Sequence, residues 1–279
     1  MIEGQVTALN FYPVKGARGI AIETARVNTT GLAIESVADR EWMLVDRNRV
    51  FVSQREVPRL ALVKPSVNDD ALVLDAPGAP QFRLPLAMPA QPAQQVRVWS
   101  AEVRGFDMGD QVATWLTSFL ERNVRLVRFD RSHPRRCNPD YVGDSGAHTM
   151  FADGYPLLVI GEESLADLNV RLATRGSPAL PMNRFRPSVV VSGLEAYAKD
   201  HIDTITTENV ALKLVKPCTR CQVTTTDQAT ARVGREPLTT LASYRRDDRL
   251  AGVIFGMNAI VLRPGTLRRG ETFHAEFRW

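Results

Sequence analysis

A series of short β-strand candidates separated by turns fills about the first hundred residues and limits the folds open to this chain. The candidates are rich in β-branched and aromatic residues or alternate in polarity, as half-buried strands do; they are 5–11, 21–28, 41–45, 60–63, 71–74, 94–99 and 103–106. Segment 77–92 holds five prolines and one glycine, which predicts a break in any continuous sheet. The pattern therefore predicts a small all-β unit, either a barrel or a sandwich.

The remainder of the chain mixes helical and strand periods. A helix is predicted from Asp110, because apolar residues recur there at the spacing of one helical face. Further on, strands are predicted at 156–160, 188–192, 210–215, 253–262 and 271–277, with helices at 162–172 and 237–244. Since strands outnumber helices, we expect an α+β, predominantly β fold: a small N-terminal β-barrel-like domain, then a second β-barrel domain with a few helices.

Composition and cysteine usage exclude several classes of protein. The 279 residues are 44% hydrophobic and 24% charged, which is typical of a globular protein. Three cysteines are too few for a disulfide framework, which favours a reducing compartment. The start, Met1-Ile2-Glu3-Gly4, has neither the basic residues nor the apolar run of a signal or transit peptide, and no later segment is long enough to cross a bilayer. We therefore expect a cytoplasmic protein without a membrane partner.

The charge is mildly basic, with a formal net value of +4. One local excess of positive charge consists of arginines, with few aromatic residues among them: Arg122, Arg125, Arg128, Arg131, Arg135 and Arg136. Nucleic-acid binding requires a denser basic face with interleaved stacking groups, so we expect no nucleic-acid partner. The simpler interpretation is a solvated surface strip, and the alternative is a contact for an anionic cofactor or an acidic electron-transfer protein.

The segment 217–221, Pro-Cys-Thr-Arg-Cys, carries two of the three cysteines with an arginine between them. A neighbouring cation favours the thiolate, which is the form that binds metals and attacks electrophiles. A thioredoxin-like redox pair would need a long helix after the motif, whereas a Thr-rich strand is expected there. A zinc site could be assembled from His133, Cys137, Cys218 and Cys221. The remaining alternative is a pair of ordinary buried thiols.

Three separate segments place a cation at a predicted strand edge next to proline, glycine or an aromatic residue. They are YPVKG at 12–16, DREWMLVD at 39–46 and NRFRP at 183–187. Each alone is typical of a surface charge whose stem covers apolar area. Together with the cysteine motif, they indicate an anionic ligand that carries phosphate and is bound by guanidinium groups.

These motifs resemble those of a known family. YPVKG, GLAIESVADREWMLVD, FADGYPLLVIGEESLADLNVRL, NRFRPSVVVSG and PCTRCQVTTTD occur in the same order as in the MOSC proteins, which are named for the C-terminal domain of molybdenum-cofactor sulfurase. The chain is most similar to the branch that includes the bacterial YcbX type and the mitochondrial amidoxime-reducing component. The resemblance covers nearly the whole chain and implies a MOSC N-terminal β-barrel domain at residues 1–120 and a MOSC domain at residues 121–279.

The resemblance implies a molybdenum cofactor, a pyranopterin whose dithiolene gives two sulfurs to the metal and whose phosphate needs cations. Cys221 matches the family's protein ligand of molybdenum, with Cys218 as the alternative. The residues that match cofactor contacts are Lys15, Gly16, Arg40, Gly154, Tyr155, Arg186, Thr219 and Arg220. Gly16 stands where the mitochondrial members have serine, so a side-chain hydrogen bond is not expected there. Asp227 and Asn258 are candidate outer-shell or substrate-side groups, and Asp227 or His148 is a candidate proton relay.

The implied reaction is the reduction of N-hydroxylated compounds such as amidoximes, hydroxamic acids, hydroxylamines and hydroxylated nucleobases, with Cys221 and Asp227 as catalytic residues. The metal would perform the difficult step, and the protein would orient the substrate. Some relatives carry a ferredoxin domain, but no cysteine follows Cys221 here, and a plant-type cluster needs about four. Electrons would therefore come from a separate ferredoxin- or flavin-type donor. The alternative function is a non-catalytic cofactor carrier or sulfur-handling module.

Overall fold

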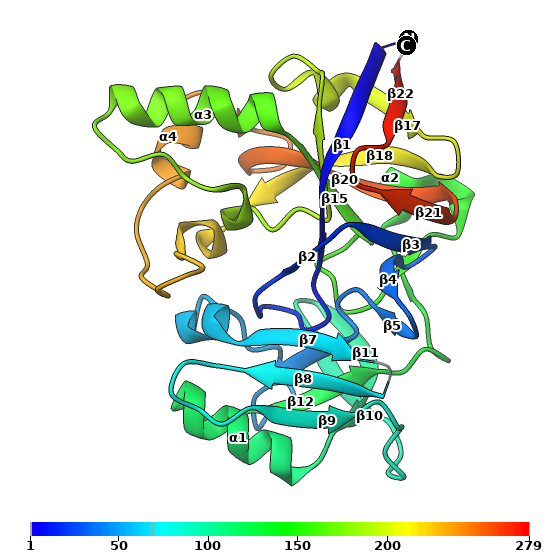
Figure 1. Cartoon of the computed structure of the whole chain (residues 1–279), viewed down its shortest axis with the longest axis vertical. Coiled ribbons are helices and arrows are strands. Elements are labelled where there is room, and N and C mark those ends of the chain that lie inside the picture. Colours follow the sequence, from blue (N-terminus) through cyan, green and yellow to red (C-terminus); the bar gives the residue numbers. More distant parts are fainter. Residues whose placement is uncertain (1, 69, 279) are drawn as a thin grey trace.

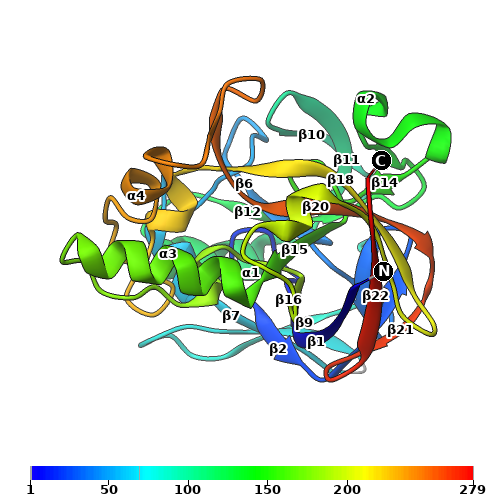
Figure 2. The ribbon, with the colours of Figure 1, turned by 90° about the horizontal axis from the view of Figure 1, so that it is seen from above.

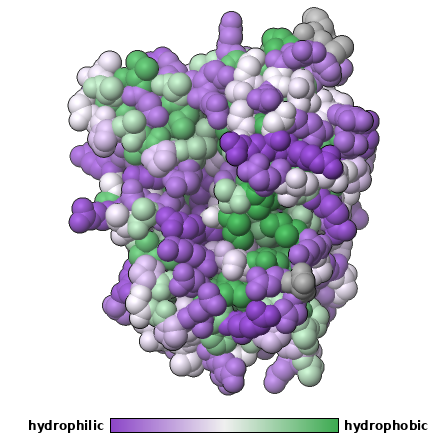
Figure 3. All heavy atoms as spheres, viewed as in Figure 1, coloured by the Kyte–Doolittle hydropathy of each residue, from purple (hydrophilic) through white to green (hydrophobic). Residues whose placement is uncertain are grey.

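Two strand-rich halves lie one above the other along the long axis of the molecule (Figure 1). The computed structural model describes residues 2–68 and 70–278. The protein is mostly β, with 42% strand and 19% helix, which confirms the predicted fold class. Hydrophilic side chains cover most of the face shown in Figure 3, and hydrophobic side chains gather near its middle height. Among the described helices, none combines the length and apolar character needed to cross a membrane.

A closed ring of strands forms the upper half. In order around the ring, the strands are β15 (Leu157–Gly161), β16 (Val189–Ser192), β1 (Ile2–Phe11), β22 (Thr272–Phe277), β17 (Ile202–Thr206), β18 (Ala211–Arg220) and β20 (Gly252–Arg263). β20 pairs with β15 and thereby closes the ring, which Figure 2 shows from above. All neighbours are antiparallel except β15 and β16, which are parallel. Closure leaves few free sheet edges in this half.

β1, near the start of the chain, is one of the strands of this ring and pairs with β16 on one side and β22 on the other. β2 (Ile20–Ile22) also pairs with β1, and the short β19 (Arg246–Asp247) extends the sheet next to β20. The N-terminal segment therefore supplies a strand to the C-terminal barrel. The domain limits 1–120 and 121–279 stay a prediction.

The lower half consists of small antiparallel sheets. One sheet contains β6 (Trp42–Val45), β12 (Arg125–Phe129), β11 (Ala101–Asp107) and β10 (Gln94–Val98); a second contains β7 (Lys64–Asn68), β8 (Ala71–Asp75) and β9 (Phe82–Pro85). Helix α1 (Asp110–Leu120) contacts β12 and β9 through its predicted apolar face, where Val112, Leu116 and Phe119 are buried. A further sheet, β21 (Gly265–Arg268), β3 (Thr24–Asn28), β4 (Gly31–Ile34) and β5 (Val37–Ala38), lies between the two halves (Figure 1).

One hydrophobic cluster joins the two halves, because it contains Leu9 and Val191 of the barrel together with Leu72 and Leu116 of the lower half. On the outside of the barrel, α3 (Glu162–Thr174) buries Leu168 and Leu172 in a smaller cluster. The remaining helices and strands are short: β13 (Arg135–Arg136), α2 (Pro139–Val142), β14 (His148–Thr149) and α4 (Leu238–Ala242). Barrel and lower sheets are thus held against each other by a shared core.

Two predicted strands are 3-10 helices instead. Residues 60–62 of the predicted strand 60–63 belong to the 3-10 helix Pro58–Leu62, where a proline occupies the first turn and the apolar residues Leu60 and Ala61 are buried. The Thr-rich segment after Cys221 forms the 3-10 helix Gln222–Thr225. Its hydroxyls bond to nearby carbonyls, with Thr224 Oγ1 2.9 Å from the Cys221 oxygen. Such local bonds compete with the hydrogen bonds of a strand.

Candidate active site

A single cavity gathers residues from distant parts of the sequence. It is lined by loops of the lower half, by the segments that enter β15 and β16, and by the end of β18. Most of the residues predicted for the site line it: Lys15, Gly16, Arg40, Gly154, Tyr155, Arg186, Cys218, Thr219, Arg220, Cys221 and Asn258. Folding therefore brings the three basic segments and the cysteine motif to one place.

Arg40 and Arg186 lie against the same aromatic ring. Their guanidinium carbons are 4.2 and 4.5 Å from the centroid of Tyr12. Both residues have a left-handed backbone, with φ of 51° and 55°, which is costly for a residue with a Cβ and tends to occur at functional sites. Arg40 is paired with the buried carboxylate of Asp39 and donates to Ser188 Oγ at 3.2 Å. The two positive charges are therefore held close together by the fold.

Burial disfavours the charged forms of the cations that line the cavity, even though Asp39 and Asp153 pair with two of them. Burial lowers the pKa of Arg186 to about 10, and the neighbouring Arg40 charge adds to the effect. Burial likewise lowers the pKa of Lys15, although the carboxylate of Asp153 opposes the shift. The Lys15 ammonium is paired with Asp153 and lies 4.7 Å from the ring centroid of Phe51. A bound anion would relieve the repulsion among these groups.

The cysteine motif lies where β18 ends and the 3-10 helix Gln222–Thr225 begins. Arg220 Nη1 donates to Cys218 Sγ at 2.9 Å, and Nη2 donates to the Phe185 oxygen at 2.7 Å. Burial nevertheless raises the pKa of Cys218, because it outweighs the opposing effect of Arg220. Arg220 thus acts on the Cys218 pKa in the predicted direction, but burial makes the net shift upward.

Arg220 also has one unsatisfied group. Its Nε is buried and has no hydrogen-bond partner among residues 2–68 and 70–278. Buried N–H groups in proteins nearly always have a partner, which is often a ligand or an ordered water. Because Arg220 lines the cavity, a ligand with acceptor atoms would satisfy this donor.

The sequence matches two family models over most of its length. Residues 3–123 match the MOSC N-terminal beta barrel domain, and residues 146–274 match the MOSC domain. Mitochondrial amidoxime-reducing component 1 of Mus musculus is 37% identical over 279 residues, an alignment that covers 96% of this chain and 81% of that protein. The chain belongs to the MOSC family.

Other relatives agree with this assignment. This MOSC protein is 35% identical to mitochondrial amidoxime-reducing component 1 of Homo sapiens over 280 residues, which covers 96% of this chain and 82% of the relative. Among solved structures, the YUAD protein from Bacillus subtilis covers 100% of this chain and 98% of its own, with 12% identity and a TM-score of 0.43. That structural likeness is too distant to carry an argument.

The relatives also correct one expectation. The predicted cytoplasmic location is contradicted, because the relatives are named mitochondrial amidoxime-reducing components. The prediction depended on the small number of cysteines and on the first residues of the sequence. A small number of cysteines favours a reducing compartment and does not distinguish one such compartment from another.

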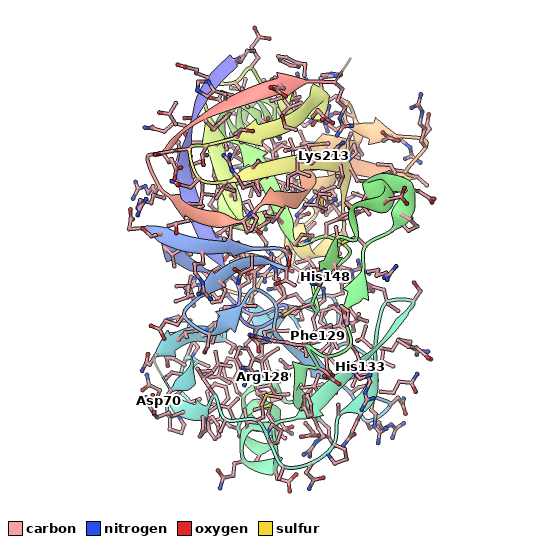
Figure 4. The ribbon with its side chains drawn as sticks, turned by 90° about the vertical axis from the view of Figure 1, so that its right-hand side faces the viewer. Asp70, Arg128, Phe129, His133, His148 and Lys213 are labelled. Atoms are coloured by element: carbon pink, nitrogen blue, oxygen red, sulfur yellow. The ribbon has the colours of Figure 1, made fainter. Side chains whose placement is uncertain are left out.

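Asp227 and His148 do not line the cavity of the MOSC protein. Asp227 Oδ1 accepts hydrogen bonds from the backbone N–H groups of Ala229 at 2.9 Å and Thr230 at 2.8 Å. Burial alone would raise the pKa of Asp227, but these bonds and the nearby Arg184 lower it. His148 belongs to β14 and lies beside Phe129 and Arg131 in a different depression, on the face seen in Figure 4.

The alternative zinc site has no support in the structure. Cys137 packs in a separate cluster with Val215 and Ile260, and His133 Nδ1 is 3.0 Å from Asp130 Oδ2 on the lower half (Figure 4). Within the described part of the chain, no group of three or more His, Cys, Asp or Glu side chains could hold a metal ion. Burial raises the pKa of Cys137 to about 11, as expected of an isolated thiol.

The arginine-rich segment is more than a solvated surface strip. Arg128 is buried and donates to Glu41 Oε1 at 2.6 Å, and Arg125 Nη2 donates to Asp107 Oδ1 at 2.8 Å. Arg135 Nη2 donates to the backbone oxygen of Asp153 at 2.8 Å, which supports the loop beside the cavity. Arg122, Arg131 and Arg136 are exposed. Several of these arginines therefore stabilise the fold locally.

Sequence reasoning missed several residues of the cavity wall. They are Phe51, Ser53, Gln54, Trp99, Asp153 and Ser188. Asp153 directly precedes the predicted contact Gly154, so the FADGY motif was the available signal. Phe51 pairs with Val45 in an isolated bridge and Trp99 lies in the turn after β10, and their approach to the cysteine motif depends on how the halves pack. No local sequence pattern predicts that Phe51 and Trp99 lie near the cysteine motif.

Proposed function

We propose that this MOSC protein binds the molybdenum cofactor in the cavity and uses it to reduce N-hydroxylated compounds. The observation that carries the proposal is that one cavity is lined by two thiols and several cations: Cys218, Cys221, Lys15, Arg40, Arg186 and Arg220. Relatives aligned with 96% of the chain bear the name amidoxime-reducing component, which supports a reductase acting on this class of compound.

The residues of the cavity fit such a cofactor. A pterin phosphate needs cationic partners, and guanidinium groups match phosphate oxygens through paired hydrogen bonds. The guanidinium groups of Arg40 and Arg186 both lie against the ring of Tyr12. The buried Nε of Arg220 has no hydrogen-bond partner among the described residues. Soft thiolate ligands suit a sulfur-ligated transition metal, and Cys221 supplies one.

We assign the following roles. Cys221 binds the metal, and Lys15, Arg40 and Arg186 hold the phosphate. The remaining cofactor contacts are Gly16, Gly154, Tyr155, Thr219 and Arg220. Asn258 lies on the substrate side, where its amide donates to the Lys216 oxygen at 3.3 Å. When bound, the cofactor supplies the oxygen-atom and electron transfer that side chains cannot perform.

For Asp227 we propose a positioning role. Its carboxylate accepts backbone hydrogen bonds from its own loop and lies 3.5 Å from Arg184 Nη2. Arg184 Nη1 in turn donates to the Thr224 oxygen, three residues after Cys221, at 3.3 Å. Asp227 would thus hold the loop that follows the metal ligand. Electrons would come from a separate ferredoxin- or flavin-type protein.

The test is turnover by the cofactor-loaded protein. Benzamidoxime should be reduced to benzamidine with a chemical electron donor such as reduced methyl viologen. Cys221→Ser should lose more than about 100-fold of this activity, because removal of outer-shell groups alone typically causes losses of 10- to 100-fold. Cys218→Ser, a change in the same motif, is the matched control and should keep most of the activity.

Each other outcome has a defined meaning. If Cys218→Ser abolishes turnover while Cys221→Ser does not, the ligand is Cys218 and our assignment is wrong. If the loaded wild-type protein reduces no N-hydroxylated compound, the proposed activity is wrong and the protein is a cofactor carrier or sulfur-handling module.

A further inference from the structure

Trp99 occupies a backbone position that disfavours a large side chain. In the hairpin of β10 and β11, Val98 lies opposite Ala101, so Trp99 and Ser100 alone form the turn. Trp99 has a φ of 54°. Two-residue hairpin turns prefer Asn, Asp or Gly at such positions, because these residues tolerate a left-handed backbone. Local folding preferences therefore do not explain the tryptophan, and such conflicts are typical of functional sites.

The side chain is exposed at the cavity instead of being buried in the core. Trp99 lines the cavity, and 39% of its surface is exposed. Within the described part of the chain, it is the only aromatic residue among the exposed large hydrophobic ones. Trp99 thus presents apolar surface at the cavity wall.

Neighbouring groups fix the orientation of this ring. Trp99 Nε1 donates to Asp153 Oδ1 at 2.9 Å, and Asp153 is also the partner of Lys15. The Phe51 ring meets Trp99 edge-on, with centroids 5.3 Å apart and an angle of 85° between planes. A ring held in this way loses little freedom when a ligand stacks on it.

Two cations lie over the ring: the buried Lys15, whose Nζ is 5.8 Å from the centroid, and the exposed Arg55, which lies closer. The guanidinium carbon of Arg55 is 4.6 Å from the Trp99 centroid, and Arg55 is exposed. Its side chain makes no hydrogen bond or ion pair with the residues that the structure describes. An exposed cation–π contact is weak, so a flat molecule can displace the guanidinium and stack in its place.

We propose that Trp99 is a stacking shelf that binds the flat aromatic part of the substrate at the cavity. The inference rests on the proposed function, because it selects among N-hydroxylated compounds: aromatic amidoximes and N-hydroxylated nucleobases are preferred over aliphatic ones. Stacking requires only a planar π face, so the shelf favours rings without distinguishing strongly between them.

The test compares benzamidoxime with acetamidoxime on the cofactor-loaded protein. In Trp99→Gly, the ratio of the KM for benzamidoxime to that for acetamidoxime should rise about 5- to 100-fold, as expected for loss of one ring stack. Trp99→Phe removes the indole N–H but keeps a ring, so it should keep a ratio close to that of the wild type. Molybdenum content should be the same in all variants.

The hairpin between β4 and β5 provides a matched control. There Ile34 lies opposite Val37, so Glu35 and Ser36 form a two-residue turn, and Glu35 has a φ of 51°. Glycine relieves the left-handed strain at either turn, so Glu35→Gly should leave the melting temperature unchanged or raise it. Trp99→Gly also loses the hydrogen bond to Asp153 and the contact with Phe51, and it should still unfold cooperatively. Only Trp99→Gly should alter the KM ratio.

The proposal is wrong if Trp99→Gly leaves the ratio of the two KM values unchanged. It is also wrong if Trp99→Phe changes this ratio as much as Trp99→Gly does. Calorimetric binding of benzamidoxime separates this failure from failure of the proposed function. If the wild type binds benzamidoxime without reducing it and Trp99→Gly does not bind it, the stacking role of Trp99 is supported and the proposed reductase activity is wrong. If neither protein binds benzamidoxime, the shelf is wrong.

Discussion

Backbone conformation at single residues shapes the cavity. Gly16, Arg40 and Arg186 all have left-handed backbones, with φ of 85°, 51° and 55°. The glycine could be understood from the sequence, because glycine is the usual residue for such a conformation. The arginines gave no such signal, since their residue type is rarely found there. Their conformations are set by the surrounding contacts, including the Tyr12 ring that both arginines share.

At this scale we predict that Gly16→Ser destabilises the fold although mitochondrial relatives are expected to carry serine there. A left-handed backbone costs a residue with a Cβ about 1–2 kcal/mol. In addition, the new Cβ would lie 2.7 Å from Leu60 Cδ2, and relieving that overlap adds roughly 1–3 kcal/mol. The free energy of unfolding from urea titration measures the sum.

Gly78→Ser is the control for Gly16→Ser. Gly78 has a φ of 74°, and apart from its chain neighbours no atom of residues 2–68 or 70–278 lies within 4 Å of a Cβ added there, so only the backbone strain applies. Equal losses in the free energy of unfolding for the two variants would show that the Leu60 side chain moves aside without a measurable free-energy cost. The close contact would then not exclude serine at position 16.

At the scale of elements, most of the strands predicted from periodicity and both longer helices are present, but several observed strands, among them β7, β12 and β17, were not predicted. The apolar run 60–63 could be a buried strand or a buried helical turn, and with Pro58 in its first turn the segment forms a 3-10 helix that ends at Leu62. β9 forms inside the proline-rich segment because it is the edge strand of its sheet, where proline is tolerated. β18 extends to Arg220, beyond the predicted end at 215, because its partner β20 continues alongside it.

The 3-10 helix Ala198–His201 next to α3 leads to a prediction about pH. Its Lys199 is buried, with Nζ 2.6 Å from Ser164 Oγ. Burial lowers the pKa of Lys199 from an ordinary value of 10.5 to about 8. Between these values the unfolded chain binds a proton that the folded protein does not, so stability rises with pH across this range.

Comparing the wild type with Lys199→Met isolates the contribution of Lys199 to the pH dependence of stability. The unfolding free energy of the wild type minus that of the variant should increase by about 1.5 kcal/mol between pH 8 and pH 9.5, as measured by urea titration. Lys213→Met is the control, because Lys213 lies on the barrel surface (Figure 4) with 44% of its side chain exposed. A pH-independent difference for Lys199→Met would show that Lys199 does not titrate as described.

At the scale of the whole molecule, β1 links the two halves. It completes the barrel between β16 and β22, although it precedes every strand of the lower half. We therefore predict that a fragment of residues 121–279 does not unfold cooperatively, because it exposes two unpaired barrel edges. Circular dichroism during urea titration measures this, with the full chain as the control. A sharp transition in the fragment would mean that the barrel does not need β1.

The cavity could be predicted only in part, because it belongs to the molecule as a whole. The motifs around Lys15, Arg40, Arg186 and Cys221 identified the residues that carry charge and sulfur. Trp99 and Phe51 join them only because the lower half packs against the end of β18. Such contacts depend on the relative placement of distant segments, which local sequence patterns do not specify.

The central claim is that Cys221 binds molybdenum in this cavity, and X-ray absorption at the molybdenum edge tests it most directly. The loaded wild-type protein should show the two dithiolene sulfurs and one further sulfur ligand. Cys221→Ser should lose one sulfur from that shell, while Cys218→Ser should keep all of them. An unchanged sulfur shell in Cys221→Ser, or a wild-type protein that takes up no molybdenum, would contradict the account.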